Sequence, residues 1–466
     1  MINKGLNFLS FNKLQLMDSK KEKIVYIVHS IDTEGPLVES IETTFHRLDT
    51  ILGIKMKPSE QTLKKIQSQE LDLGGKEEIA SKIFSPHLLD YNDSWEKLEK
   101  MLLKIMDSKF RKKIPDSFGN GWIFNWHCLD HVGYKTNPVC RDFGHHKIFD
   151  RYKNMIEKTK SGQDSIHWHF HPMSFYKEAN RRGNSFFNSF HLHEVLCRKI
   201  IEREWFPKVY RAGFHLERND INLFLEQWIP FDISNQSVKD MSLEDKQADQ
   251  QKERFADWRL AIDDWSTYHP SHDNYQLKGN CRRVIARCLN LLTRQTNINQ
   301  EEVNKAFERA NKELPTILGI TNHDFRNMAN EIIPFQEMLL KAKEKFPDVK
   351  FVYSEAVDAF RNILYGKNYN FGKLVLDVSL EKNSNIWRLN IKMKEGKIFG
   401  PQPYLAIKTK DGKFYHDNLD LVELDKEWSF TFDEDTIKSE DISILGVASN
   451  DKYANSFVKI IYATEE

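Results

Sequence analysis

The chain has 466 residues, 40% of them hydrophobic, which is enough for two or three domains with large cores. Its 68 Lys and Arg equal its 68 Asp and Glu, and this formal net charge of +0 argues against a large basic surface for nucleic acid. The five Cys form no CxxC pair, and no apolar run approaches the roughly 18 residues of a membrane span. We therefore expect no disulfide framework, no membrane span and no nucleic-acid partner.

The first part of the chain predicts alternating strands and helices. Residues 1–23 are polar and lack the apolar centre of a secretion signal, so we expect an N-terminal tail and a cytoplasmic protein. The predicted strands are 24–31, 121–127, 165–171, 208–213, 230–234, 316–322 and 349–353. The predicted helices are 94–107, 147–160, 192–205, 219–228, 303–313 and 332–345. Repeated β-then-α units predict a parallel sheet or an α/β barrel over residues 24–366.

Two segments depart from this alternation. Residues 236–300 are first polar and then rich in Trp, Tyr and His, and we expect an insertion over the barrel mouth instead of another βα unit. Trp265, His269 and Tyr275 are its candidate substrate contacts, although a helical pad of packed aromatic rings remains an alternative. From residue 367 to 466 about six short alternating runs, separated by turn signals such as 395–397 and 410–412, predict an antiparallel β-sandwich.

Polar residues gather where the predicted strands end. Asp32 and Glu34 follow the first strand, and two carboxylates at this spacing on an extended segment point the same way. Such a pair can divide metal binding and proton transfer between them, although a solvated turn would have the same composition.

The run His167-Trp168-His169-Phe170-His171 is the most specific local pattern of the chain. Side chains alternate on a strand, so the three imidazoles share one face and the two aromatic rings the other. Neutral imidazole is a common ligand of zinc-like metals, which favours a metal site over a polar strand end.

Three further strand ends carry single polar groups. Arg211 can orient a carboxylate or bind an anion, and a structural salt bridge is its alternative. Asp232 comes directly after the apolar residues 230–231 of the fifth predicted strand. His323, next to Asp324, suits general-acid work because a neighbouring carboxylate can raise the imidazole pKa.

Taken in chain order, these elements resemble the five motifs of the polysaccharide deacetylase family, which includes chitooligosaccharide and peptidoglycan deacetylases. The resemblance covers residues 24 to about 360 and rests on Asp32/Glu34, His167-x-x-x-His171, Arg211, Asp232 and His323. It implies a distorted seven-stranded (β/α) barrel. The chain has Asp32-Thr33-Glu34 where the family has adjacent acids, and Ala212-Gly213 where a Pro usually follows the arginine. These departures suggest a divergent member.

The resemblance also implies a mechanism. Glu34 or Asp32 would bind a divalent metal together with His167 and His171, or with His169 and His171. The metal would be zinc by ligand type, with cobalt, nickel or iron as alternatives. Asp32 would be the base oriented by Arg211, His323 the acid, and Asp232 a substrate contact.

The substrate implied is an N-acylated sugar, nucleotide-linked or lipid-linked sugar, or glycan. The absence of a secretion signal, and not the motifs, suggests bacterial surface-polysaccharide synthesis inside the cell. A catalytically inactive carbohydrate-binding or scaffold protein, and a cyclic-amide hydrolase on the same fold, remain alternatives.

Overall fold

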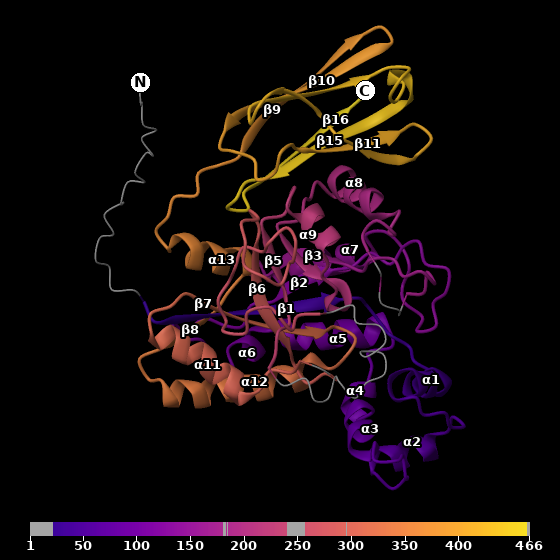
Figure 1. Cartoon of the computed structure of the whole chain (residues 1–466), viewed down its shortest axis with the longest axis vertical. Coiled ribbons are helices and arrows are strands. Elements are labelled where there is room, and N and C mark those ends of the chain that lie inside the picture. The colour runs from indigo at the N-terminus through magenta and orange to yellow at the C-terminus, as the bar shows by residue number, and fades with distance from the viewer. Residues whose placement is uncertain (1–21, 180–182, 184, 240–256, 295, 464–466) are drawn as a thin grey trace, which may run out of the picture.

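A closed parallel barrel forms the centre of the molecule (Figure 1), in a computed structural model that describes residues 22–179, 183, 185–239, 257–294 and 296–463. The expected tail lies outside these residues up to residue 21. The barrel strands are β1 (Ile24–Thr33), β2 (Asn125–Cys128), β3 (Ser165–Phe170), β4 (Val209–Ala212), β5 (Phe231–Asn235), β6 (Val284–Asn290) and β7 (Thr316–His323). The ring closes because β1 pairs with both β7 and β2.

The barrel is distorted at β1. An eighth strand, β8 (Lys350–Tyr353), pairs with the first half of β1 at Ile24–Ile27, whereas β2 pairs with the second half at Ser30–Thr33. One long strand therefore has two successive neighbours on the same side, and the seven-stranded ring is complete only toward its carboxyl end.

The seven strands of the ring are not the seven that the sequence predicted. β6 lies within residues 236–300, where an insertion without a βα unit was expected, and that prediction was wrong. Arg283 precedes the apolar run, and Arg287 and Asn290 interrupt it, yet all three side chains are buried and have ion-pair or hydrogen-bond partners. The predicted strand 349–353 exists as β8 but lies outside the ring.

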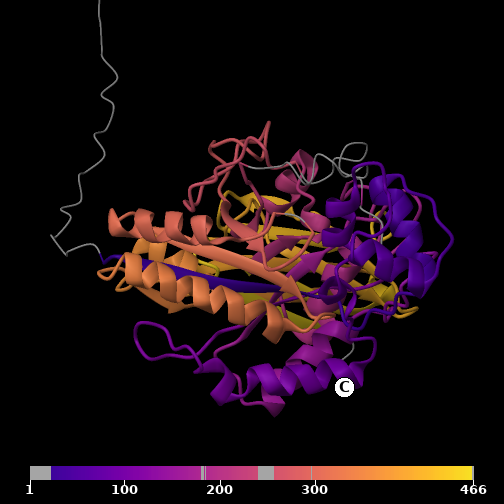
Figure 2. The same ribbon diagram turned by 90° about the horizontal axis from the view of Figure 1, so that it is seen from below.

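Helices surround the strands (Figure 2). They are α5 (Trp95–Met106), α6 (Ser108–Arg111), α7 (Lys147–Lys158), α8 (Leu192–Arg203), α9 (Asn219–Leu225), α11 (Gln300–Asn311), α12 (Met328–Lys345) and α13 (Ala356–Tyr365). In α5 the Ser94 side chain accepts from the backbone N–H of Lys97 and caps the first turn. Its Leu98, Leu102 and Ile105 are spaced three or four residues apart and face the barrel core.

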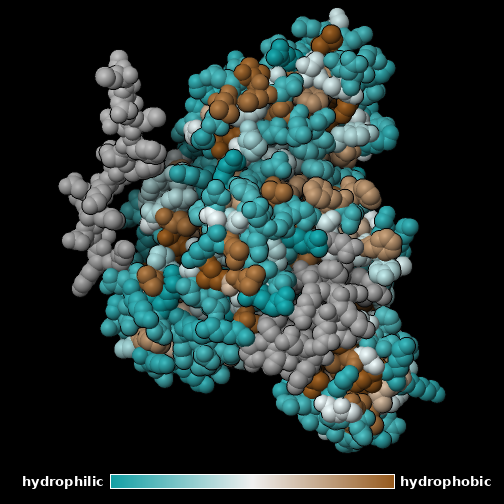
Figure 3. Space-filling model, in the orientation of Figure 1, coloured by the Kyte–Doolittle hydropathy of each residue, from teal (hydrophilic) through white to brown (hydrophobic). Residues whose placement is uncertain are grey.

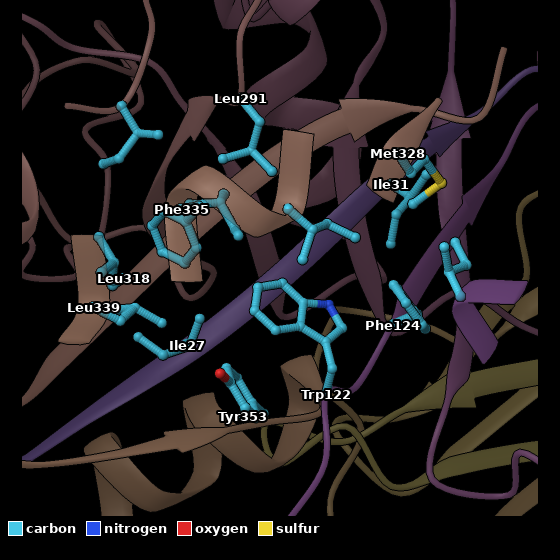
Figure 4. Close-up of a cluster of buried hydrophobic side chains, with 14 of the residues drawn as sticks. Ile27, Ile31, Trp122, Phe124, Leu291, Leu318, Met328, Phe335, Leu339 and Tyr353 are labelled. Carbon is cyan, nitrogen blue, oxygen red and sulfur yellow. The ribbon is translucent and has the colours of Figure 1, made fainter. Parts of the chain in front are cut away.

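The main core lies between β1 and these helices (Figure 4). Trp122 lies at its centre, with its ring 4.6 Å from that of Tyr353 and 6.2 Å from that of Phe335. A second cluster joins Val28 of β1 to Val209 of β4 and Ile233 of β5. Since β1 is not a neighbour of β4 or β5, Val28 meets the other two side chains across the barrel interior. Alternate residues of each strand therefore face inward and outward.

A small helical lobe follows β1. It consists of α1 (Ile41–Leu52), α2 (Glu60–Gln67), α3 (Glu77–Ile83) and α4 (Pro86–Leu89), which enclose a core of their own that includes Phe45, Leu48 and Phe84. The sequence analysis assigned no element here. The lobe projects from the barrel on the side away from the C-terminal sheets, and hydrophobic side chains show on its surface (Figures 1 and 3).

The C-terminal region forms two antiparallel four-stranded sheets, as the alternating pattern predicted. One has the order β13-β14-β10-β9 and the other β12-β11-β15-β16. The strands are β9 (Val375–Asn383), β10 (Ile386–Glu395), β11 (Tyr404–Thr409), β12 (Phe414–Asp417), β13 (Asp420–Glu423), β14 (Glu427–Phe432), β15 (Ile442–Asn450) and β16 (Ser456–Tyr462). Ile391 and Trp428 of the first sheet share one core with Ile407 and Leu445 of the second, so the two sheets pack as a sandwich.

None of the helices in the described part of the chain combines the length and the apolar character needed to cross a membrane.

Candidate metal-binding and catalytic site

The carboxyl ends of four barrel strands bring the predicted polar groups together. Asp32 lies in β1 and Glu34 directly after it, and His169 lies in β3 and His171 directly after it. Arg211 lies in β4, and His323 ends β7. Because parallel strands end at the same rim of a barrel, side chains from distant parts of the sequence share this end. Five of the six are buried, and the imidazole of His323 is 19% exposed.

Glu34, His169 and His171 form a group that can bind a metal ion. The two Nε2 atoms lie 2.9 Å apart, and Oε1 of Glu34 lies 3.5 Å from Nε2 of His171 and 3.9 Å from Nε2 of His169. Tetrahedral ligands at zinc bond lengths of about 2.0–2.1 Å would be about 3.3 Å apart. The observed separations average close to this spacing, and two imidazoles with one carboxylate match the ligands of a catalytic zinc site that keeps one position open.

The hydrogen bonds of the imidazoles suit this role. Nδ1 of His169 lies 3.0 Å from the carbonyl oxygen of Arg211, which can only accept, so His169 carries its proton on Nδ1. Its Nε2 lone pair then faces His171 and Glu34. An outer partner that fixes the tautomer in this way is usual for metal-binding histidines.

His167 lies apart from this group. It shares the inward face of β3, but two residues earlier it lies deeper in the barrel, where its Nε2 is 2.8 Å from Oγ of Ser165 and 2.8 Å from Oε1 of Glu355. The ring of His127 lies beside it, 5.1 Å between centroids. Of the two histidine pairs that the sequence left open, the structure therefore places His169/His171, and not His167/His171, beside Glu34.

Asp32 lies between an arginine and a histidine. Nε of Arg211 donates to its Oδ1 at 2.6 Å, and Nε2 of His323 lies 3.8 Å from its Oδ2. Arg211 also donates to the carbonyl oxygen of Ile233 at 2.9 Å, so its guanidinium has a defined orientation. Nε2 of His323 is 3.7 Å from Oε1 of Glu34. A carboxylate, the arginine that orients it and an imidazole thus border the candidate metal position.

Burial and neighbouring charges set the protonation states. Burial opposes ionisation of Glu34, but Arg141 and His171 outweigh it and hold the pKa of this carboxyl well below its usual range. Burial also places the pKa of His171 well below its usual range. An ionised carboxylate and a neutral imidazole are the forms that bind metals.

Asp324 supports the site in a way that the sequence analysis did not expect. Its carboxylate does not act on the neighbouring His323, whose pKa burial lowers to about 4. It accepts instead from the backbone N–H groups of Glu34 at 3.0 Å and Gly35 at 2.9 Å, and from the hydroxyl of Tyr152 at 2.8 Å. Asp324 therefore holds the backbone that carries the Glu34 carboxylate.

The loop after β4 supports His171. A Cβ atom on Gly213 would lie 2.0 Å from Cδ2 of His171, so this position requires glycine. The ring of Phe214 packs against His171 with 4.2 Å between centroids. Gly213 thus leaves room for the imidazole.

The four residues predicted to bind substrate do not reach the site. Alternation along β5 turns Asp232 outward, where it is 1% exposed and pairs with Arg283 at 2.6 Å. Trp265 is buried against Arg287. Tyr275 packs on Trp258, and His269 is exposed and contacts the carbonyl oxygen of Cys281. None of these four residues lines the cavity beside the site, because Asp232 faces outward from β5 and the ring side chains of the 257–281 segment pack on one another and on the barrel wall.

The cavity beside the site, about 290 Å³ in volume, is lined mainly by residues that the sequence did not single out. Asp32, Glu34, His323 and Phe325 lie on its barrel side. The helical lobe and Tyr91, which follows it, contribute the other side; the lobe residues are Thr43, His46, Arg47, Thr50, Ile51, Ile83 and Leu88. Arg141 and Arg326 also line it. The only sequence signal for the lobe is its helical periodicity, and for Arg326 its position just after His323.

A second group of possible ligands lies at the opposite end of the strands. Glu226, His272 and Cys281 come close together before β5 and β6. The Glu226 carboxylate already accepts from the backbone N–H of Arg282 at 2.8 Å, so this group has a structural explanation.

Comparison of the chain with protein-family models, with curated protein sequences and with solved structures finds no match.

Proposed function

We propose that the chain is a metal-dependent hydrolase that removes an N-acyl group, acetyl or formyl, from an amino sugar, as a divergent protein of the polysaccharide deacetylase type. The observation that carries the proposal is the convergence of Glu34, His169 and His171 with the Asp32–Arg211 pair and His323 at one end of the barrel. A lone salt bridge or a polar strand end would not need these groups from four strands.

Glu34, His169 and His171 would hold the ion, which the donor set favours as zinc, with cobalt, nickel and iron able to use the same ligands. Once bound, it would act as a Lewis acid on the scissile amide and lower the pKa of the attacking water.

Asp32 is the base. Arg211 occupies its Oδ1 and leaves Oδ2 directed toward His323, so Oδ2 takes the proton of the attacking water. His323 is neutral at pH 7 because burial lowers its pKa to about 4. It therefore donates to the departing amine only after it has received a proton, and Asp32 at 3.8 Å is the source. Positioned proton transfer of this kind contributes about 10²–10⁴-fold to a rate.

The test is a panel of N-acetyl and N-formyl amino sugars together with cyclic amides, with release of acetate or formate as the readout. Asp32→Asn and His323→Ala should retain the metal and lose about 10²–10⁴-fold in turnover. His269→Ala, an exposed histidine outside the cavity, is the matched control and should keep full activity. Purified protein without stoichiometric metal, or cleavage of cyclic amides alone, would refute the proposal.

A further inference from the structure

Two buried arginines lie against one aromatic ring at the edge of the site. The guanidinium carbon of Arg141 is 4.8 Å from the ring centroid of Phe325, and that of Arg326 is 5.3 Å from it. Arg141 is 9% exposed and Arg326 is 7% exposed. Both side chains line the cavity of about 290 Å³.

Several donors of these arginines are unused. Nε and Nη1 of Arg141 and Nη2 of Arg326 have no hydrogen-bond partner among the described residues, although all three atoms are buried. Buried N–H groups without an acceptor are costly and uncommon in folded proteins. Their presence around one cavity indicates that a ligand supplies the missing acceptors.

The arginines are next to the chemistry. Nη2 of Arg141 donates to Oε2 of Glu34 at 2.6 Å, and the ring of His323 lies 4.6 Å from that of Phe325. A group bound by Arg141 and Arg326 would therefore lie close to both the Glu34 carboxylate and the His323 imidazole. This places the unused donors in the substrate cavity and not on a separate surface.

The charges favour an anionic group over a sugar hydroxyl. Arg141 pairs with Glu34, but a bound cation would also interact with this carboxylate, so Glu34 would neutralise the arginine only in part. Arg326 pairs with Glu331 at 2.8 Å, and burial raises the pKa of that glutamic acid above its usual range, which weakens the pair. Guanidinium groups bind phosphate and carboxylate oxygens through paired N–H donors, and such charged hydrogen bonds are about twice as strong as neutral ones.

We infer that the substrate carries an oxyanion, phosphate or carboxylate, bound by Arg141 and Arg326 beside Phe325. The enzyme then acts on sugar phosphates or acidic N-acyl sugars and not on neutral glycans. This inference rests on the proposed function, since it names the substrate class of the same site.

The experiment measures binding by calorimetry to the protein as purified. The probes are N-acetylglucosamine, its 1-phosphate, its 6-phosphate and N-acetylmuramic acid. This set distinguishes binding of a phosphate from binding of a carboxylate. We expect at least one anionic sugar to bind about 10- to 100-fold more tightly than the neutral one, as hydrogen bonds to charged groups allow. Arg326→Gln should abolish that preference, whereas Arg388→Gln, a matched change in the sandwich, should keep it.

A thermal scan of each variant checks folding, and Arg141→Gln replaces Arg326→Gln if the latter does not fold. Equal binding of neutral and anionic sugars, or no binding of any probe, would overturn the inference. So would a preference that survives Arg326→Gln and disappears in His171→Ala, because the anion would then depend on the metal ligands.

Hydrolysis measured in parallel separates the two proposals. Arginine-dependent binding without hydrolysis refutes the proposed function and keeps the anion site. Hydrolysis of neutral and anionic sugars at equal rates, unaffected by Arg326→Gln, refutes only the anion site.

Discussion

Residues of the same type have different partners when they lie at different depths in the barrel. His167, His169 and His171 share one face of β3, yet only the last two reach the rim where Glu34 lies. His167, one step deeper, binds Ser165 and Glu355 instead. β3 ends at Phe170, and Nε2 of His171 lies 2.9 Å from Nε2 of His169, whereas Nε2 of His167 is already engaged deeper in the barrel.

This difference can be tested by metal content. His171→Ala should lose the bound ion, because it removes one of three ligands. His167→Ala should keep stoichiometric metal, because its imidazole bonds to other groups. Elemental analysis of the two purified variants, with circular dichroism to check folding, makes the comparison. Loss of metal from His167→Ala alone would contradict the assignment.

A second residue-scale prediction concerns Gly213. Gly213→Ala places a methyl group 2.0 Å from Cδ2 of His171, so the imidazole must shift. We expect metal affinity to fall about 10- to 100-fold, as for other changes that disturb the support of a ligand. Gly162→Ala is the control, since its added Cβ meets nothing within 4 Å. Competition with a fluorescent chelator measures both, and equal affinities would show that the site tolerates the shift.

At the scale of elements, the alternation of side chains along β1 places polar residues on both of its faces, in different surroundings. Its inward face ends in Asp32, whereas its outward face carries His29 under Trp122. Nδ1 of His29 accepts from the indole N–H of Trp122 at 3.0 Å, and its Nε2–H donates to Oδ1 of Asn322 at 2.9 Å. The neutral ring satisfies both partners. Burial is the main reason that its pKa is lowered to about 3.

This lowered pKa predicts a pH dependence of stability. Between about pH 3 and the ordinary histidine pKa of 6.5, the unfolded chain binds a proton at His29 that the folded chain does not. The neutral ring thus makes its whole contribution to the free energy of unfolding above pH 6.5, and this contribution decreases as the pH falls. His29→Gln keeps one donor and one acceptor but does not titrate. Between pH 7 and pH 5 its free energy of unfolding should therefore fall by about 2 kcal/mol less than that of the wild type. Urea unfolding at the two pH values measures this, and identical pH profiles would contradict it.

At the scale of the whole molecule, the barrel and the sandwich share a core. Tyr404, Ala406 and Ala448 of the sandwich belong to the same buried cluster as Leu196 and Ile200 of α8. The side-chain amide of Asn450 donates to the carbonyl oxygens of Pro207 and Trp228, which precede β4 and β5. The sandwich is therefore packed on the barrel and does not hang from a flexible linker.

A shared core predicts cooperative unfolding. Calorimetry of the wild type should show one main transition for barrel and sandwich. Tyr404→Ala removes a fully buried ring from the shared cluster and should cost about 3–5 kcal/mol. Tyr415 is 41% exposed on the neighbouring strand β12, so Tyr415→Ala should lower the free energy of unfolding far less. Two well-separated transitions in the wild type would contradict a shared core.

The sequence predicted those parts of the fold that depend on local periodicity. Apolar runs gave the strands β1, β3, β5 and β7, and the alternating C-terminal runs gave the two sheets. β6 was missed because Arg283, just before it, and Arg287, within it, break the apolar pattern, and their acidic partners Glu217 and Glu302 cannot be recognised from the sequence. The aromatic segment after residue 257 was read as a binding surface because exposed and self-packed aromatic rings have the same composition.

The residue types and their order along the chain were enough to predict a parallel barrel with acids, imidazoles and an arginine at its strand ends. Only the tertiary structure decided which imidazoles lie beside Glu34, that Asp324 holds the Glu34 backbone, and that Arg141, Arg326 and the helical lobe enclose the cavity. The physical reason is that side-chain alternation follows from local geometry. The depth of a residue in the barrel, and its neighbours across it, depend on strand register and on contacts between distant segments.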